Sequence, residues 1–171
     1  MKARDKVIGV IALLVVAVLG WVWFAPTGLQ RAPDIELTTI DGRPISLLGL
    51  RGRPVLVTFW ATTCPGCMKE MPHLISLYHE LAPRGLEIIG IAMSYDPVAD
   101  VIALSKQRAI PYPIAHDTQS HAAQAFGDVR LTPTNILIDP DGRIVQQHIG
   151  EMDMAQARTK ILAMLGDGKP S

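Results

Sequence analysis

The sequence predicts an α/β protein with a central mixed sheet flanked by helices. Three observations lead to this prediction. Apolar runs of strand length alternate with helical patterns after residue 53, the chain ends with two adjacent strands and a helix, and 49% of the 171 residues are hydrophobic. Alternation followed by a terminal hairpin is typical of a sheet packed between helices, and the chain is long enough to bury a proper core.

A short β-extension is expected ahead of the main sheet. Residues 34–38 alternate between polar and apolar side chains, which favours a strand, and residues 45–47 form the returning strand. Asp41-Gly42 between them is a turn signal. The pattern predicts a hairpin before the first long strand.

The longest strand and helix follow directly. Residues 54–60 form a continuous apolar run, which suits a central strand that is buried on both faces. Residues 64–81 form a helix, and residues 86–93 are the next buried strand. The apolar positions of the helix have helical spacing: Leu74, Leu77, Tyr78 and Leu81.

The second half of the chain continues the alternation. A helix is expected to open at Asp96-Pro97 and to run to about Arg108, and two adjacent strands surround a turn at residues 140–143. The remaining elements are a short strand at 112–115, a short helix at 119–126, the strands at 135–139 and 144–149, and a final helix at 153–165.

The N-terminal sequence predicts a membrane-spanning segment. Residues 7–24 are uncharged, and as a helix they would span about 27 Å, close to the thickness of the bilayer core. Lys2, Arg4 and Lys6 precede them, so the positive-inside rule leaves the N-terminus in the cytoplasm. A cleaved signal peptide is the alternative. The prediction is a single-pass anchor, Val7 to Phe24, in a bacterial inner membrane, with the globular part in the periplasm.

These segments divide the chain into four parts. Residues 1–24 are a cytoplasmic stub with the anchor, 25–33 a linker, 34–165 one globular domain, and 166–171 a flexible tail. Lysine and arginine together number 16, as do aspartate and glutamate, so no basic surface argues for nucleic acid as a partner.

The chemistry is expected at the only two cysteines, Cys64 and Cys67. A strand delivers them to the first turn of a helix, where unpaired N–H groups and a partial positive charge stabilise a thiolate. Pro65 suits this turn because its missing N–H would be unpaired anyway. The arrangement predicts thiol–disulfide exchange, with Cys64 at the open end of the helix as the thiolate nucleophile and Cys67, one turn in, as the more buried resolving thiol.

Other interpretations of the cysteine pair remain open. A structural disulfide would close too short a loop to constrain the unfolded chain, and zinc would need a second ligand pair. A copper-binding assembly factor is the main alternative function, and a thiol peroxidase ranks last because Ala61 stands where that class has threonine. The soft ligands offered to Cu(I) would be Cys64, Cys67, Met68, Met71 and His73.

The segment from Trp60 to Pro72, Trp-Ala-Thr-Thr-Cys-Pro-Gly-Cys-Met-Lys-Glu-Met-Pro, resembles the active-site segment of thioredoxin-like proteins. It is most similar to the membrane-anchored TlpA/ResA/CcmG type, and the resemblance covers about residues 32–165. Thr63 departs from the tryptophan that the family often has before the first cysteine, and Pro65-Gly66 is not its usual dipeptide. These departures leave the redox potential, and with it the direction of electron flow, open.

The resemblance implies a thioredoxin-like fold with a central insertion between Tyr95 and Ala115, and a reductant of protein disulfides. Cytochrome c maturation or a related thiol pathway would be its setting, a membrane donor would supply its electrons, and no cofactor beyond the dithiol would be needed. It also implies a cis Thr132–Pro133 bond in a loop that faces the cysteines and leaves the Thr132 backbone free for substrate. The alternative without a functional role is an ordinary trans proline at the start of a strand.

Two further residues belong to the expected site. Glu70 follows Cys67 by three positions, and it either stabilises the helix start or tunes the pKa and relays the proton of Cys67; the resemblance implies the second role. Trp60 is grouped with Thr132 and Pro133 on the substrate side, although it is expected to pack beneath the motif.

Overall fold

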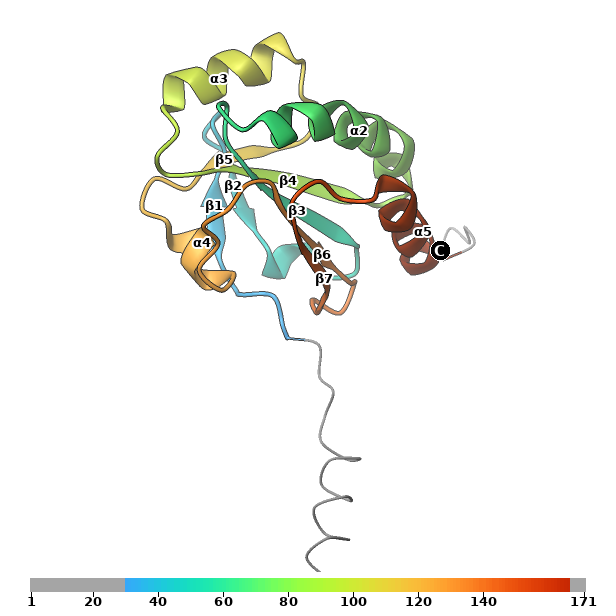
Figure 1. The fold of residues 1–171 in the computed structure, drawn as a ribbon. Coiled ribbons are helices and arrows are strands. Elements are labelled where there is room, and N and C mark those ends of the chain that lie inside the picture. Colours follow the sequence, from blue (N-terminus) through green and yellow to red (C-terminus); the bar gives the residue numbers. More distant parts are fainter. Residues whose placement is uncertain (1–29, 167–171) are drawn as a thin grey trace, which may run out of the picture.

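The computed structural model describes residues 30–166, which form a mixed five-stranded sheet with helices on both faces (Figure 1). The strand order is β5-β4-β3-β6-β7. β3, β4 and β5 are parallel, and β6 and β7 are antiparallel to their neighbours, which confirms the predicted mixed sheet. The strands are β3 (Val55–Trp60), β4 (Glu87–Ala92), β5 (Ile114–His116), β6 (Thr134–Ile138) and β7 (Ile144–Ile149).

β3 is the central strand, and all six of its residues are buried. Because successive side chains point to opposite faces of a sheet, Leu56 and Trp60 join one apolar core, whereas Val57 and Phe59 join the other. Burial on both faces explains why this strand reads as a continuous apolar run. The same strand leads directly into Cys64.

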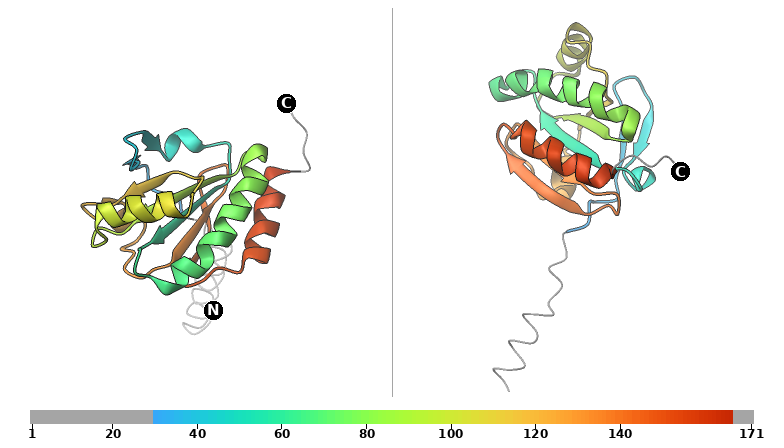
Figure 2. Two further views of the ribbon diagram at one scale, coloured as in Figure 1. Left: turned by 90° about the horizontal axis from the view of Figure 1, so that it is seen from above. Right: turned by 90° about the vertical axis from the view of Figure 1, so that its right-hand side faces the viewer.

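Three helices cover one face of the sheet, and α4 (His121–Ala125) packs into the core on the other. The three are α2 (Pro65–Leu81), α3 (Val98–Gln107) and α5 (Met154–Leu165), with the short 3-10 turns η1 (Leu48–Leu50) and η2 (Ala82–Arg84) elsewhere. α2 and α5 lie side by side (Figure 2), and Arg158 Nε of α5 donates to Glu80 Oε1 of α2 at 3.0 Å.

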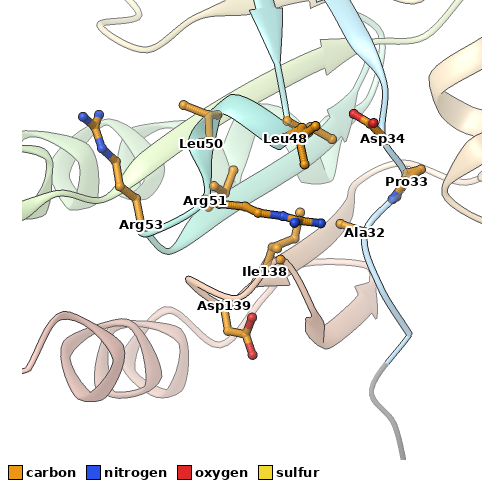
Figure 3. A pocket seen from close by; sticks show the side chains of 12 residues that line it. Ala32, Pro33, Asp34, Leu48, Leu50, Arg51, Arg53, Ile138 and Asp139 are labelled. Atoms are coloured by element: carbon orange, nitrogen blue, oxygen red, sulfur yellow. The ribbon is translucent and has the colours of Figure 1, made fainter.

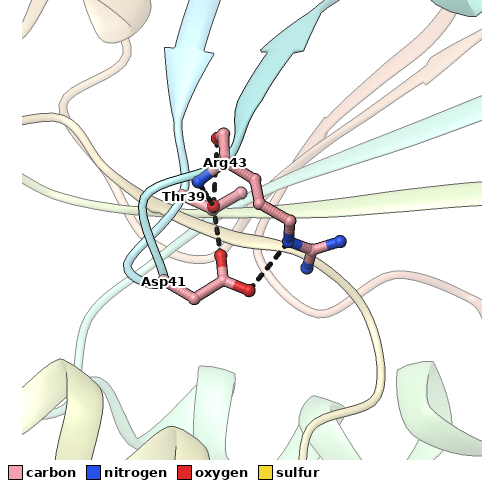
Figure 4. A network of polar contacts seen from close by, with 3 residues as sticks. All are labelled: Thr39, Asp41 and Arg43. Carbon is pink, nitrogen blue, oxygen red and sulfur yellow. Dashed lines mark hydrogen bonds and ion pairs between the residues drawn. The ribbon is translucent and has the colours of Figure 1, made fainter.

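The predicted β-extension is present as a separate hairpin of β1 (Glu36–Thr38) and β2 (Pro44–Ser46). Its turn is closed by Asp41, which accepts hydrogen bonds from the Thr39 hydroxyl and from Arg43 Nε (Figure 4). The hydrogen bond from Thr39 and, to a smaller extent, the contacts with Arg43 lower the pKa of Asp41. The Ile40 N–H donates to the Ile114 carbonyl at 2.8 Å, so the hairpin is tied to β5.

The first described residues, 30–32, lie against the turn between β6 and β7. The Ala32 N–H donates to the Gly142 carbonyl at 2.9 Å, and the Ile144 N–H donates to the Gln30 carbonyl at 2.8 Å. The last residues of the predicted linker therefore lie against this turn. A small pocket beside them is lined by Ala32, Asp34, Leu48, Arg51 and Asp139, among others, and by neither cysteine (Figure 3).

Two predictions concern residues outside this range. The anchor at residues 7–24 lies outside the described residues, as does the tail beyond Gly166. Between residues 30 and 166, no helix combines the length and the apolar character that crossing a membrane requires.

The predicted element bounds shift by one or two residues at several ends. α2 begins at Pro65 rather than Cys64, because Cys64 has extended backbone angles and caps the helix. α3 begins at Val98, and Asp96 does not open it; its side chain instead binds Thr62. The helix α2 continues through Pro72, which lies inside it.

Candidate active site

Cys64 and Cys67 form a disulfide at the start of α2. Their Cα atoms are 5.3 Å apart, and the Cys67 N–H donates to the Cys64 sulfur at 3.1 Å, so this sulfur caps the helix. The residue Cys64 is 8% exposed and Cys67 is 3% exposed. Both cysteines are therefore buried, and Cys64 is slightly the less buried of the two, the order expected for an attacking and a resolving residue.

The start of α2 favours a thiolate on Cys64 once the disulfide is reduced. A sulfur that accepts a backbone hydrogen bond at a helix N-terminus gains from the donor and from the partial positive charge of the helix end. Pro65 occupies the first helical position, where its missing N–H has no cost. The first turn of α2 therefore offers Cys64 a backbone donor and the positive end of a helix, the two features that stabilise a thiolate.

The loop before β6 lies against this first turn. The Thr132–Pro133 peptide bond is cis, as the resemblance implied. A Cβ atom on Gly66 would lie 3.2 Å from Pro133 Cδ, closer than an ordinary contact. The glycine between the cysteines therefore permits the close approach of the proline ring, and the prediction that this loop faces the cysteine pair is confirmed.

Apolar side chains are exposed next to this loop. Leu131 is 61% exposed, and Ile149 is 59% exposed. Ile149 at the end of β7 pairs with Thr134 at the start of β6. Ile149 and Leu131 therefore lie at the edge of the sheet where the cis-proline loop joins β6. Leu131 and Ile149 both line a hollow at this end of the sheet, together with Thr134.

Glu70 lies one turn beyond Cys67 and is 3% exposed. Its carboxylate accepts hydrogen bonds from Asn135 Nδ2 at 2.9 Å and from the Met152 backbone N–H at 2.7 Å. Burial raises the pKa of Glu70, an effect that the two hydrogen bonds oppose. The site thus contains a carboxyl group with a raised pKa, about one helical turn from Cys67 on α2.

Trp60 packs beneath the motif in the apolar core and is 3% exposed. Its indole Nε1 lies near Gly90, where an added Cβ would be 3.1 Å away. Little of the Trp60 surface is free, so the ring packs in the core under the motif, and its grouping with Thr132 and Pro133 on the substrate side stays a prediction.

Two functional candidates were missed from the sequence. Asn135 is fully buried and binds Glu70, and Asp96 accepts hydrogen bonds from the Thr62 N–H and hydroxyl at 2.7 and 2.5 Å. An amide directly before the apolar run Ile136-Leu137-Ile138 was the available signal for Asn135. Asp96 gave no such signal, because Asp before Pro also suits a helix start.

The copper hypothesis gains nothing from the described part of the chain. Residues 30–166 contain no group of three or more His, Cys, Asp or Glu side chains that could hold a metal ion. On α2, Met71 is buried in the core whereas His73 is exposed, so these two proposed ligands point to different surroundings.

A helix-capping disulfide of two cysteines three apart, on a mixed sheet and against a cis-proline loop, is the arrangement of the thioredoxin-like thiol–disulfide oxidoreductases, and this chain is one of that class. The chain belongs to the AhpC/TSA family, whose model matches residues 29–147.

Individual relatives agree with this class. The chain is 35% identical over 127 residues to the thiol-disulfide oxidoreductase ResA of Bacillus thuringiensis (strain Al Hakam), covering 74% of this chain and 72% of the relative. It is 36% identical over 134 residues to ResA of Halalkalibacterium halodurans, covering 76% and 75%. The crystal structure of a thiol:disulfide interchange protein of the thioredoxin family from Chlorobium tepidum TLS superposes with a TM-score of 0.73 at 29% identity, covering 80% of this chain and 97% of that one.

Proposed function

We propose that this protein reduces disulfides of other proteins on the periplasmic side of a bacterial inner membrane, in cytochrome c maturation or a related thiol pathway. The observation that supports this most directly is the position of Cys64, whose sulfur caps α2 beside the cis Thr132–Pro133 loop. No cofactor beyond the two cysteines takes part.

The reaction proceeds by two exchanges. The Cys64 thiolate attacks one sulfur of the substrate disulfide, a bond forms between them, and the second substrate sulfur leaves as a thiolate that takes up a proton. Cys67 then loses its proton to Glu70 and attacks the Cys64 sulfur, which forms the Cys64–Cys67 disulfide and releases the other substrate thiolate. Two electrons pass from the cysteines to the substrate, and its two thiolates take up one proton from solvent and one from Cys67 by way of Glu70. A membrane-bound thiol donor then reduces the disulfide.

The substrate meets the protein at the loop that contains Pro133. An extended substrate segment pairs with the backbone of Thr132, as in the addition of a strand to a sheet edge. The exposed side chains of Leu131 and Ile149 beside this loop supply apolar contact area.

The uncharged segment at residues 7–24 anchors the protein in this proposal. The support is its length and the preceding basic residues, Lys2, Arg4 and Lys6. Fusing a reporter that is active only in the periplasm after Ser171, and extracting membranes with carbonate, checks both topology and attachment. A soluble or cytoplasmic product contradicts this part of the proposal.

Capture of substrates tests the function. In full-length Cys67→Ser, a mixed disulfide on Cys64 cannot be resolved, so partner proteins remain attached and can be identified after non-reducing electrophoresis. Full-length Cys64→Ser is the matched control and should retain none. If a folded Cys67→Ser variant captures no protein, the proposed exchange does not occur.

The direction of electron flow is tested by the equilibrium potential of the Cys64–Cys67 pair. Equilibration of the full chain with glutathione buffers should give a low potential, typical of a reductant. A potential near that of strong periplasmic oxidants would reverse the proposed direction.

A further inference from the structure

Asn135 occupies an unusual place for an amide. It is fully buried in β6, the strand that follows the cis-proline loop, and it lies opposite Thr58 of the central strand. Its Nδ2 atom is 2.9 Å from both carboxylate oxygens of Glu70. The amide therefore contacts Glu70 from the sheet, while the Met152 N–H contacts the same carboxylate from the loop before α5.

The hydrogen bonds of this amide are incomplete. Nδ2 donates to Glu70 and has the Gly150 carbonyl as a further acceptor at 3.5 Å, but the buried Oδ1 atom has no partner among residues 30–166. A buried polar atom without a partner is costly, so its presence calls for an explanation. A rotated amide would offer Oδ1 to Glu70 as an acceptor, which is the partner that a protonated carboxyl group needs.

The surroundings of Glu70 contain few compensating charges. Among residues 30–166, its carboxylate forms no ion pair. Lys69 on the same helix instead binds Glu151 at 2.6 Å, and the charge of Glu151 opposes ionisation of Glu70. His148 of β7 has the opposite effect and lowers the pKa of Glu70. Tyr112, before β5, is also nearby: its pKa is raised mainly by burial and, to a smaller extent, by the charge of Glu70.

We propose that Asn135 is a positioning residue for the thiol–disulfide reaction, because its amide holds the Glu70 carboxyl group in both protonation states for proton exchange with Cys67. This inference rests on the proposed function. Nδ2 donates to the carboxylate, and after rotation Oδ1 accepts from the protonated group. Cys67 and Glu70 are three positions apart on α2, which places their Cβ atoms about 5–6 Å apart.

The proton moves without any other reactant. The Cys67 thiol gives its proton to the Glu70 carboxylate as Cys67 becomes the attacking thiolate, and the electron pair of the S–H bond stays on sulfur. The carboxyl group returns the proton when the departing substrate thiolate is protonated. Asn135 exchanges no proton, and its amide only follows the state of Glu70.

The test measures the titration of the Glu70 carboxyl group in the oxidised full-length chain, by carboxyl ¹³C NMR with Glu70→Gln for assignment. Asn135→Leu keeps the branched shape of the side chain, with a larger volume, but removes the hydrogen bond to the carboxylate. The Glu70 midpoint should rise by about one to two pH units, the amount expected for one hydrogen bond to a charged group. Asn135→Ser, a smaller change, is measured in parallel in case leucine disturbs β6. Ser105→Ala is the matched control, since its buried hydroxyl also lacks a partner but lies on α3.

A second measurement separates positioning from simple loss of stability. With Cys64→Ser in the background, Cys67 is the only thiol, and its alkylation rate is followed against pH. Asn135→Leu should change this profile when Glu70 is present and should leave it unchanged in Glu70→Gln. An unmoved Glu70 midpoint, or equal changes in both backgrounds, overturns the proposal. Neither measurement needs a substrate, so failure of the proposed function would be seen separately, in the capture experiment.

Discussion

Asp96 and Thr62 are joined by two hydrogen bonds although 34 positions separate them in the sequence: the Thr62 N–H donates to Oδ2 at 2.7 Å and its hydroxyl to Oδ1 at 2.5 Å. Asp96 is 3% exposed, and its carbonyl is 2.7 Å from the ring nitrogen Nε2 of His116. The expected central insertion is thus attached to the segment that precedes Cys64.

Replacement of Asp96 by alanine should destabilise the protein and loosen this segment. Two hydrogen bonds to a buried charged group are lost, so a decrease of about 3 kcal/mol in the free energy of unfolding is expected. Urea unfolding measures it. Asp100→Ala, an exposed position in the first turn of α3, is the control and should change stability little. A cost for Asp96→Ala no larger than that of the control would show that the two bonds contribute nothing.

Glu70→Gln should stabilise the protein at neutral pH. The pKa of Glu70 is raised in the folded protein by burial, so folding favours the protonated form. The contribution of Glu70 to the free energy of unfolding is fully present at a pH below 4.5, the pKa of this group in the unfolded chain. It is lost as the pH rises through the pKa of Glu70 in the folded protein. Glutamine imitates the protonated group, so the two proteins should match in acid, and the variant should become the more stable one as pH rises. Urea midpoints at acidic and neutral pH check this; a constant difference contradicts it.

Gly66→Ala should reduce exchange more than stability. The new Cβ would lie 3.2 Å from Pro133 Cδ, so the loop that faces the disulfide must shift. Alanine is favoured over glycine in a helix by about 1 kcal/mol, which offsets part of the strain. The expected result is a nearly unchanged melting temperature with a slower reduction of a model protein disulfide. Gly49→Ala, where the Cβ would be 3.7 Å from its nearest neighbour, should leave the rate at the wild-type value.

Gly90→Ala should be destabilising, because β4 packs tightly under Trp60. The added Cβ would meet Ile114 Cδ1 at 2.5 Å and Trp60 Nε1 at 3.1 Å. The isoleucine terminus can move, but the indole is held in the core, so a cost of about 1–3 kcal/mol is expected. Thermal unfolding measures it, and a melting temperature equal to that of the wild type would mean that the core adapts more freely than the packing indicates.

Local patterns were enough to predict most of the fold. The alternation of apolar runs with helical spacing gave the order of the elements, and Asp41-Gly42 and the turn at 140–143 located both hairpins. These features depend on neighbouring residues in the chain, so they are visible before folding. The bounds at Asp96 and Cys64 were less accurate, because side chains there bind distant partners or cap a helix.

The cysteine pair at a helix start could be predicted from the order of residues alone, since two cysteines three positions apart after an apolar run have few other uses. The groups that surround this pair, in contrast, are brought there by folding. Asn135 meets Glu70 across 65 positions, and Met152 meets it across 82, because β6 lies beside β3 and the loop before α5 folds against α2. A buried carboxylate takes its proton affinity from contacts of this kind, and no pattern along the chain specifies them.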